Sequence, residues 1–335
     1  MLELAVVIVN YNTCELLEAC LQSVYASYEA PTYHIVVVDN GSTDGSVEML
    51  RRRFPQATTI RSDRNGGFGY GNNLALRWLS RQGSPPDRGT VGQPLDESGP
   101  PDGMQPLLEK PLSGASSLHL PCAYVLFLNP DTLLPPDALA RTVAFLEQHP
   151  DAGALGPKVV KLDGSLDLAC RRSFPTPVSS LFKLSGLSKL FPRSRLVARY
   201  NLTFLGDDTT AEVDSVMGAY MLVRGESLEE AGLFDERFFM YGEDLDLAYR
   251  LKVRGWRVYY YPEVSVLHHK GASSRKVSQR SIREFYRAMH IFYRKHYARR
   301  YTGLVNALVY LGIAARGSVA LARNAFRPAE SKRVT

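Results

Sequence analysis

Three short, continuously apolar segments constrain the fold of this chain more than any other feature. Residues 4–9, 35–38 and 124–128 carry no charged side chain and are rich in Val, Ile and Leu. Strands have this pattern when helices cover both of their faces, as in the parallel sheets of α/β proteins. Amphipathic helical patterns and a further short strand alternate with these segments, at residues 13–28, 47–54, 58–60 and 74–79. The alternation predicts an α/β fold with a doubly wound sheet flanked by helices.

The alternation is interrupted between residues 82 and 121. This segment contains eight Pro and six Gly among forty residues, above the roughly 25–30% that is typical of low-complexity sequence. The patterns on either side of it are strong, so we interpret it as a flexible insertion that carries no catalytic group. The predicted organisation is one domain over residues 1–275, which contains the insertion, followed by a helical tail over residues 276–335.

The composition is typical of a globular enzyme of the cytoplasm. The 335 residues are 45% hydrophobic, which is enough for a full core. The four cysteines form no Cys-x-x-Cys pair and show no zinc-finger spacing, so we expect reduced thiols. The apolar first residues have no basic segment before them and run directly into a strand pattern, which argues against a signal peptide.

The tail is strongly basic. Residues 270–335 contain 15 Lys and Arg against two acidic residues, whereas the rest of the chain has 25 basic and 32 acidic residues. Apolar and aromatic residues recur at helical spacing over 282–297, and an apolar run at 304–315 is shorter than the ~20 residues that span a bilayer. This combination predicts an anchor on an anionic membrane surface, and no nucleic-acid site. The alternative is a helix packed on the protein's own body, with its charges in solvent.

Three carboxylates lie within four positions, at Glu243, Asp244 and Asp246. Carboxylates held close together raise one another's pKa values, which suits a general base in a catalytic cleft. Asp131 closely follows the apolar segment 124–128, where open α/β sheets bind ligands, and its oxygen donors suit a divalent cation. Each segment by itself also fits a structural role, as a helix N-terminus and as a turn.

Other polar residues follow predicted strands. Asp39 comes directly after the second apolar segment and could accept a hydrogen bond from a nucleobase or ribose, or cap the next helix. The turn at Asn65 and Gly66 allows the backbone to approach a phosphate closely. His268 and His269 end another strand pattern and fit a metal or diphosphate ligand as well as a structural pair. The sequence has no P-loop motif, and no Gly-x-Gly-x-x-Gly follows its first strand.

Seven motifs, in this order, resemble those of the inverting family 2 glycosyltransferases of GT-A fold, and especially their bacterial rhamnosyltransferase-like branch. They span residues 3–275 apart from the insertion, and their specificity lies in their number and order. The resemblance implies a GT-A fold, with a mixed doubly wound sheet flanked by helices and a C-terminal helical tail. The motifs are VIVNYN at 7–12, VVVDNGSTD at 36–44, NGGFGYGNN at 65–73, LNPDT at 128–132, MGAYMLVR at 217–224, YGEDLDL at 241–247 and HHKGAS at 268–273.

The resemblance implies a nucleotide-sugar site near the first strands. Tyr11 and Asp39 would hold the nucleobase and ribose of the donor, and Asn65 and Gly66 would line the nucleotide pocket. Asn129 belongs to the same donor site and stands where the family's Asp-x-Asp metal motif has its first Asp. This departure weakens the expectation of strong metal binding by the loop alone.

The resemblance also implies metal and catalytic residues. Asp131, at the last position of the Asp-x-Asp motif, and His268 would hold Mg²⁺ or Mn²⁺ together with the donor diphosphate. Asp244 corresponds to the base that deprotonates the acceptor hydroxyl, with Glu243 supporting it. A cation that neutralises the departing diphosphate, and a carboxylate that activates an alcohol on the opposite face, fit direct displacement with inversion.

The implied function is transfer of a sugar, with rhamnose as a candidate, to a hydroxyl of a glycan or lipid-linked acceptor in cell-surface polysaccharide synthesis. The family's processive Gln-x-x-Arg-Trp signature is absent, so we expect one or very few sugars per encounter. The enzyme would be cytoplasmic and peripheral at the inner face of the plasma membrane. One alternative is a sugar nucleotidyltransferase, although the first strand lacks the basic Gly-rich loop that such an enzyme needs. The other is a non-catalytic membrane-surface protein, which leaves the pair Glu243 and Asp244 unexplained.

Overall fold

The computed structural model describes residues 2–83, 118–269 and 279–326. Within these ranges the chain forms a nine-stranded mixed sheet. Its strand order is β3 (Thr58–Arg61), β2 (Tyr33–Asp39), β1 (Leu2–Asn10), β4 (Cys122–Leu128), β10 (Tyr220–Arg224), β6 (Ala152–Val160), β11 (Arg257–His268) and β5 (Thr132–Leu133), with β8 (Ala211–Val213) paired to β11. The first four strands in this order are parallel, β10 is antiparallel to both of its neighbours, and β6 and β11 are parallel.

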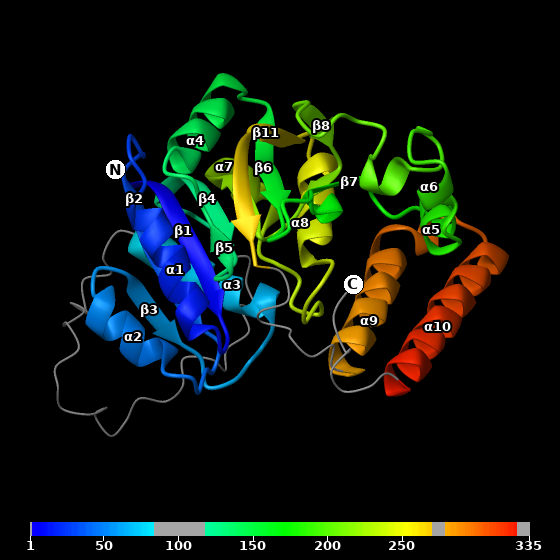
Figure 1. Cartoon of the computed structure of the whole chain (residues 1–335), viewed down its shortest axis with the longest axis horizontal. Helices are drawn as coiled ribbons and strands as arrows, with labels where there is room; N and C mark the ends of the chain where they lie inside the picture. The colour runs from blue at the N-terminus through cyan, green and yellow to red at the C-terminus, as the bar shows by residue number, and fades with distance from the viewer. Residues whose placement is uncertain (1, 84–117, 270–278, 327–335) are drawn as a thin grey trace.

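Helices cover both faces of this sheet, as predicted (Figure 1). They comprise α1 (Cys14–Tyr25), α2 (Ser46–Arg53), α3 (Phe68–Gly83), α4 (Ala138–Gln148), α7 (Gly225–Ala231) and α8 (Glu243–Val253). α3 packs on β1 and β2, whereas α4 packs on β6 and β11. A two-stranded sheet of β7 (Arg171–Arg172) and β9 (Ser215–Val216) lies next to α8. The expected α/β fold with a mixed, doubly wound sheet is confirmed.

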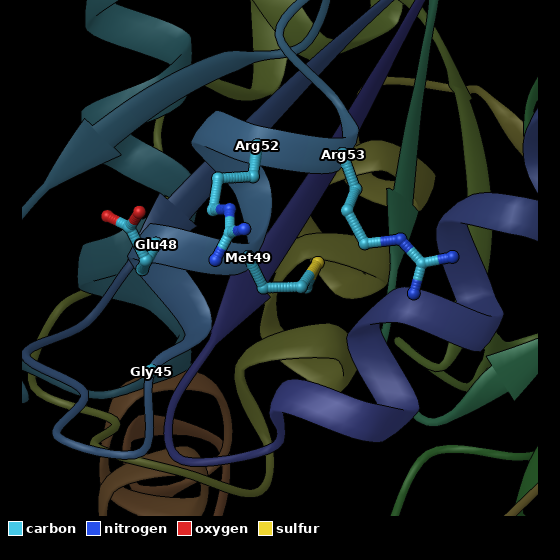
Figure 2. A pocket seen from close by; sticks show the side chains of 5 residues that line it. All are labelled: Gly45, Glu48, Met49, Arg52 and Arg53. Atoms are coloured by element: carbon cyan, nitrogen blue, oxygen red, sulfur yellow. The ribbon is translucent and has the colours of Figure 1, made fainter.

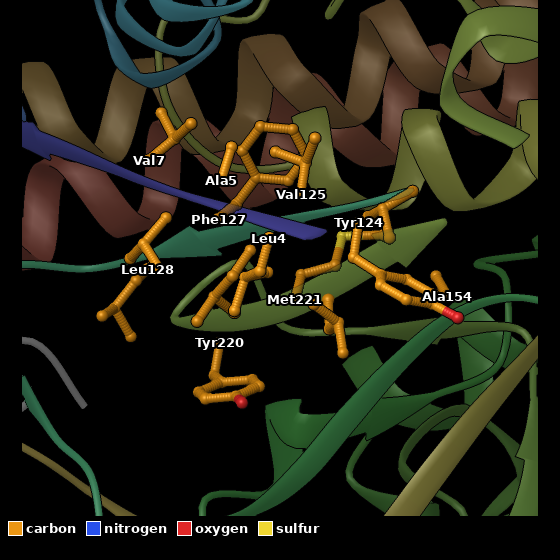
Figure 3. Close-up of a cluster of buried hydrophobic side chains, with 14 of the residues drawn as sticks. Leu4, Ala5, Val7, Tyr124, Val125, Phe127, Leu128, Ala154, Tyr220 and Met221 are labelled. Atoms are coloured by element: carbon orange, nitrogen blue, oxygen red, sulfur yellow. The ribbon is translucent and has the colours of Figure 1, made fainter. Parts of the chain in front are cut away.

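The core explains the three apolar segments. Residues 4–8 of β1 and 125–128 of β4 are completely buried. Figure 3 shows why: side chains leave these strands toward both faces, with Val7 and Phe127 on one side and Leu4 and Leu128 on the other. Each such side chain contributes roughly 1.5–3 kcal/mol when it is fully buried. A polar side chain at any position of these strands would therefore lie in the core, whichever face of the sheet it pointed to. For this reason apolar and polar residues do not alternate along these strands.

Two elements differ from the sequence expectation. α3 begins at Phe68, six residues before the predicted start, although Gly69 and Gly71 disfavour a helix by about 1 kcal/mol each. Packing explains the difference, because a Cβ at Gly71 would lie 2.6 Å from the Val9 side chain and one at Gly69 would lie 3.2 Å from Phe234. The strand pattern that ends at the two histidines is the long strand β11, which has a register shift between Tyr261 and Ser265. Of the predicted insertion, residues 84–117 lie outside the described residues.

Four further helices lie at one end of the molecule, namely α5 (Pro177–Leu184), α6 (Leu187–Leu190), α9 (Gln279–His296) and α10 (Gly303–Ala325) (Figure 1). α9 buries Phe292 and Tyr293, and the next residue after the helix, Tyr297, joins them in a second apolar cluster with Leu245 and Tyr249 of α8. These aromatic side chains are therefore packed on the protein's own body, and the expectation that their stripe faces a membrane is not supported.

α10 contains the apolar run 304–315 but is much longer than that run. It has 23 residues with a mean hydropathy of 1.6 in its most apolar window, and only 6% of that window is buried. The length and composition of the helix are sufficient to cross a membrane. The predicted apolar run is thus one part of a longer helix, because Ala, Gly and Val residues continue the helix beyond residue 315.

Candidate active site

The predicted site residues converge at one edge of the sheet. Because β1, β2 and β4 are parallel, their carboxyl ends lie together, and open α/β sheets bind ligands at this edge. The antiparallel strand β10 begins at the same edge, since Tyr220 pairs with Leu128. The antiparallel pairing of β11 with β5 places His268 opposite Thr132. His268 and Thr132, 136 residues apart in the sequence, are therefore neighbours.

Asp39 is held rigidly at the end of β2. Its Oδ1 accepts a hydrogen bond from Asn10 Nδ2 at 3.1 Å, and its Oδ2 accepts one from the backbone N–H of Ser42 at 3.0 Å. Asn10 is itself fixed, because its Oδ1 accepts a hydrogen bond from Thr13 Oγ1 at 2.6 Å. Tyr11 follows β1 and is 45% exposed, so its ring is accessible for stacking on a base. This arrangement suits the predicted nucleoside end of a donor site.

The turn at Asn65 and Gly66 is tied to the same edge by Asn40, which the sequence analysis missed. Asn40 Nδ2 donates to Asn65 Oδ1 at 3.1 Å and to the Gly67 carbonyl at 3.0 Å, while Asn40 Oδ1 accepts from the Gly66 N–H at 3.2 Å. Gly67 has φ +94°, and a Cβ there would lie 2.1 Å from the Phe239 carbonyl oxygen. Only glycine allows this turn to approach the segment that leads into α8 so closely.

Asp131 and His268 form the second part of the site. Asp131 Oδ1 lies 3.1 Å from His268 Nε2, and both residues are buried. The backbone N–H of His269 donates to the Asp131 carbonyl at 2.8 Å, which fixes the loop onto the end of β11. His268 also lines a hollow of about 190 Å³ with Lys161, Leu162 and Asp163. The predicted pairing of a carboxylate with a histidine is thus present.

This pair fits a divalent cation in part. In the described ranges, no group of three or more His, Cys, Asp or Glu side chains is arranged to hold a metal. A carboxylate and an imidazole still form a suitable partial ligand set, because Mg²⁺ usually keeps several waters and substrate phosphates. Among the residues that the structure describes, the buried Nδ1 atom of His268 has no hydrogen-bond partner, which leaves one polar atom of this pair for a ligand or water.

The carboxylates at the start of α8 form the third part. Asp244 Oδ2 accepts a hydrogen bond from Arg172 Nη2 at 2.6 Å and from the Gly218 N–H at 3.2 Å. Asp244 Oδ1 accepts from the Leu245 N–H at 2.7 Å. Arg172 is buried on β7 and also donates to the Val216 carbonyl at 2.9 Å. The guanidinium of Arg172 therefore pairs directly with the Asp244 carboxylate inside the protein.

Glu243 has a different environment from its neighbour. It is 8% exposed, and its Oε2 has no hydrogen-bond partner within the described part of the chain. Burial, and next the negative charge of Asp244, raise the pKa of Glu243 to about 8. At neutral pH, Glu243 therefore holds a proton while Asp244 is paired with Arg172. Two adjacent carboxyl groups in different charge states are an arrangement that acid–base chemistry uses.

Asp246 does not belong to this cluster. It is fully buried on the other side of α8, where it pairs with Arg250 at 2.9 Å, Lys295 at 2.6 Å and His296 at 2.8 Å. Burial raises its pKa, but hydrogen bonding to His296 and the charges of Arg250 and Lys295 outweigh this and lower it. The expected crowding of three carboxylates is therefore limited to two, because a helix directs positions two apart to different sides.

Two consecutive residues connect the second and third parts of the site. The Gly218 N–H donates to Asp244, and the Ala219 carbonyl accepts from the Asn129 N–H at 3.0 Å and from Thr132 Oγ1 at 3.2 Å. Asn129 thus takes part through its backbone. The MGAY motif contained this link, but no residue type in it indicated the role, because the contacts are made by backbone groups.

A larger hollow of about 500 Å³ lies elsewhere, on α2 (Figure 2). Its lining includes Glu48, Met49, Arg52 and Arg53. None of the predicted site residues lines it, and the candidate active site is defined instead by the three groups of polar residues at the sheet edge.

Comparison with known proteins identifies the family to which this chain belongs. Residues 3–287 match the family model described as glycosyltransferase like family 2. The chain belongs to glycosyltransferase family 2. The prediction of a glycosyltransferase is confirmed, and the nucleotidyltransferase and non-catalytic alternatives are set aside.

Two relatives of this glycosyltransferase are named rhamnosyltransferases. One is the N-acetylglucosaminyl-diphospho-decaprenol L-rhamnosyltransferase of Mycobacterium tuberculosis, 29% identical over 86% of this chain and 83% of that protein. The other is the rhamnosyltransferase WbbL of Escherichia coli, 25% identical over 83% of this chain and 88% of that protein. These relatives agree with the predicted rhamnosyltransferase-like branch.

Solved structures support the fold. The mannosyltransferase PcManGT from Pyrobaculum calidifontis, in complex with GDP-Man and Mn²⁺, has a TM-score of 0.51 and 19% identity, covering 96% of this glycosyltransferase and 75% of that chain. TarS of S. aureus also has a TM-score of 0.51, with 16% identity, covering 87% of this glycosyltransferase and 39% of that chain. The expected GT-A fold is thereby confirmed.

Proposed function

We propose that this enzyme transfers a single sugar, with L-rhamnose as the first candidate, from a nucleoside-diphosphate donor to a hydroxyl of a lipid-linked acceptor. The reaction would invert the anomeric configuration and would serve cell-surface polysaccharide synthesis at the cytoplasmic face of the plasma membrane. The observation that carries the proposal is the contrast between Asp244, paired with Arg172, and protonated Glu243. The names of the two rhamnosyltransferase relatives support the sugar, and the name of the mycobacterial relative supports a lipid diphosphate acceptor.

Each part of the site has a role in this reaction. Tyr11 and Asp39 would bind the nucleoside, with Asn65 and Gly66 along the nucleotide and Asn129 in the loop beside the diphosphate. Tyr11 is exposed enough to stack on the base, and Asp39 is fixed by two hydrogen bonds. Binding in a fixed position brings the anomeric carbon close to the acceptor, and such positioning can supply a large part of the barrier reduction.

Asp131 and His268 would hold a divalent cation, Mg²⁺ or Mn²⁺, with the donor diphosphate completing its ligands. When bound, this cation would neutralise charge on the departing diphosphate. The residues themselves would position the diphosphate at the ends of β5 and β11, since the His269 N–H fixes the Asp131 loop. PcManGT, of the same fold, was solved with Mn²⁺ and a nucleotide sugar.

Asp244 would accept the proton of the acceptor hydroxyl as that oxygen attacks the anomeric carbon. Arg172 balances its charge in the resting enzyme, and the Gly218 N–H fixes the orientation of its carboxylate. The proton moves from the hydroxyl to Asp244, the new glycosidic bond forms, and the bond to the diphosphate breaks. Glu243, being protonated, adds no second negative charge near the acceptor.

The experiment is a donor and acceptor panel with purified protein and Mn²⁺. We expect a nucleoside-diphosphate rhamnose and N-acetylglucosaminyl-diphospho-polyprenol to give a product whose new linkage, by NMR, has the opposite anomeric configuration to the donor. Asp244→Asn should lower turnover by ~10²–10⁴-fold, because an amide cannot take the proton. Asp208→Asn, at an aspartate whose side chain is 85% exposed, is the matched control and should be fully active. Retained configuration, or wild-type turnover of Asp244→Asn in folded protein, would contradict the proposal.

A further inference from the structure

The outer face of α10 is an exposed apolar stripe. Leu304 is 73% exposed, Leu311 is 66% exposed, and Phe326, just after the helix, is 89% exposed. Their spacing of three or four residues places all members on one face of a helix. Exposed contiguous apolar surfaces of this kind mark sites of protein or membrane contact. The stripe consists of Leu304, Leu308, Leu311, Ala315, Val319, Ala322 and Phe326.

The opposite face of α10 packs antiparallel on α9. Tyr293 donates a hydrogen bond from its hydroxyl to Asn306 Oδ1 at 2.6 Å, and its ring lies 5.5 Å from that of Tyr310. Farther along, Gly317 lies so close to Tyr286 that an added Cβ would be 3.2 Å from its ring. The contact therefore runs along about half of α10, and the two helices form one unit.

This unit is fixed to the catalytic body and carries exposed charges on α9. Lys295 and His296 pair with Asp246 of α8. Arg287 and Arg294 lie on exposed positions of α9, beside the segment that contacts α10. If α10 crossed a bilayer, it would have to leave α9 or bring these charges into hydrocarbon, which is strongly disfavoured.

We infer that α10 lies in the plane of an anionic membrane, with its apolar stripe among the lipid acyl chains, and does not cross the bilayer. Charge supports an anionic lipid surface as the partner. Residues 303–325 contain Arg316 and Arg323 but no Asp or Glu, and exposed Arg299 and Arg300 precede the helix. Basic residues beside an apolar face are the features of an interfacial helix. The inference rests on the proposed function, because a lipid-linked acceptor is found at such a surface.

Vesicle co-sedimentation of the full chain tests the binding. We expect binding to vesicles containing phosphatidylglycerol, weaker binding to neutral phosphatidylcholine vesicles, and a decline as added salt shortens the screening length below ~10 Å. Replacing Leu304, Leu308 and Leu311 together by Glu should reduce binding at least tenfold. The matched control replaces three exposed apolar residues outside α10, namely Leu162, Leu168 and Val253, by Glu and should bind like the parent protein.

Side-specific labelling distinguishes the plane from a crossing. Arg323→Cys places a thiol near the end of α10, outside the stripe, and an impermeant maleimide added outside sealed vesicles should label it as fast as in free protein. Protection until detergent is added would show a spanning helix and overturn the inference. Equal vesicle binding by the stripe variant and the parent would also overturn it. So would a parent protein that forms a dimer through the stripe and does not bind lipid.

The two proposals fail in different ways. With a water-soluble acceptor analogue, the stripe variant should transfer sugar at the parent rate, because no stripe residue belongs to the active site. If the parent protein transfers sugar but does not bind vesicles, only the membrane inference is contradicted. If it binds vesicles but transfers sugar from no donor, only the proposed function is contradicted.

Discussion

Arg172 Nη2 lies 2.6 Å from Asp244 Oδ2, an ion pair that joins β7 to the first turn of α8 across 72 residues of sequence. Only 10% of the Arg172 side chain and 11% of the Asp244 side chain are exposed, so solvent screens the pair weakly. Arg172 also acts to lower the pKa of the neighbouring Glu243, but burial, and next the charge of Asp244, outweigh it and raise that pKa to about 8. Two adjacent acidic residues therefore have different environments.

Replacing Arg172 should change catalysis more than donor binding. Arg172→Gln removes the positive charge that pairs with Asp244, so kcat should fall by about tenfold or more, which corresponds to about 1.4 kcal/mol in barrier. KM for the donor should change much less than kcat, because Arg172 contacts Asp244 and not the nucleotide end of the site. Arg172→Lys should recover part of the lost kcat. Lower stability with an unchanged kcat in the folded variant would show that Arg172 acts on folding alone.

Glu243 should make the protein less stable in alkaline solution. Its folded pKa of about 8 lies above the ordinary value of 4.5, so between these pH values the folded protein holds a proton that the unfolded chain has lost. Its contribution to stability is therefore complete below pH 4.5 and is lost as the pH rises through about 8. Urea unfolding of Glu243→Gln should show a flatter pH dependence and higher stability at pH 9, by several kcal/mol at most. Parallel curves for the two proteins would contradict this assignment.

Asp131→Ala and His268→Ala should each weaken metal-dependent donor binding. Titration calorimetry with a nucleotide sugar should show about a tenfold or greater loss of affinity in the presence of Mn²⁺, while affinity for the bare nucleoside stays unchanged. His119→Ala, at a histidine whose side chain is 70% exposed, serves as the control. Full activity of the parent in excess chelator would rule out the metal role of both residues.

Asp246→Asn should loosen α9 without a direct effect on chemistry. The substitution removes the fully buried carboxylate with which Arg250, Lys295 and His296 pair, and losing one partner of such a buried set costs about 1–3 kcal/mol. Because the pKa of Asp246 is lowered, this stabilisation is present above the ordinary carboxylate pKa and is lost as the pH falls below it. Urea unfolding at pH 7 and limited proteolysis at residues 297–302 measure the loss of stability. Asp208→Asn should unfold like the parent. Equal protease resistance of the Asp246 and Asp208 variants would contradict the idea that Asp246 holds α9 on α8.

Much of the fold could be predicted because its central strands are buried on both faces and so leave a continuous apolar pattern. The start of α3 could not, because its glycines are acceptable only where β1 and Phe234 press against the helix. The faces of α9 were also ambiguous: an amphipathic stripe shows that one side avoids water, but not whether protein or lipid covers it. The structure resolves this for Phe292 and its neighbours, which pack on α8.

The site was predictable where side chains follow strand ends, as for Asp39, Asp131 and His268. Contacts made by the backbone, such as those of Gly218 and Ala219, left no signal in residue type. Arg172 was missed because a buried arginine next to another arginine carries no mark of its partner in the sequence. The expected crowding included Asp246 because the three carboxylates are close in sequence, but the helix turns Asp246 toward Arg250 and α9.

In the proposed reaction, α8 would present Asp244 to the acceptor, and two residues later it carries Asp246, which pairs with Lys295 and His296 of α9. Since α10 packs on α9, the fold would fix the distance between Asp244 and a membrane in contact with α10. An acceptor hydroxyl linked to a lipid would have to reach that distance. The enzyme would then select its substrate by the length of the link between lipid and hydroxyl, before any contact with the sugar is made.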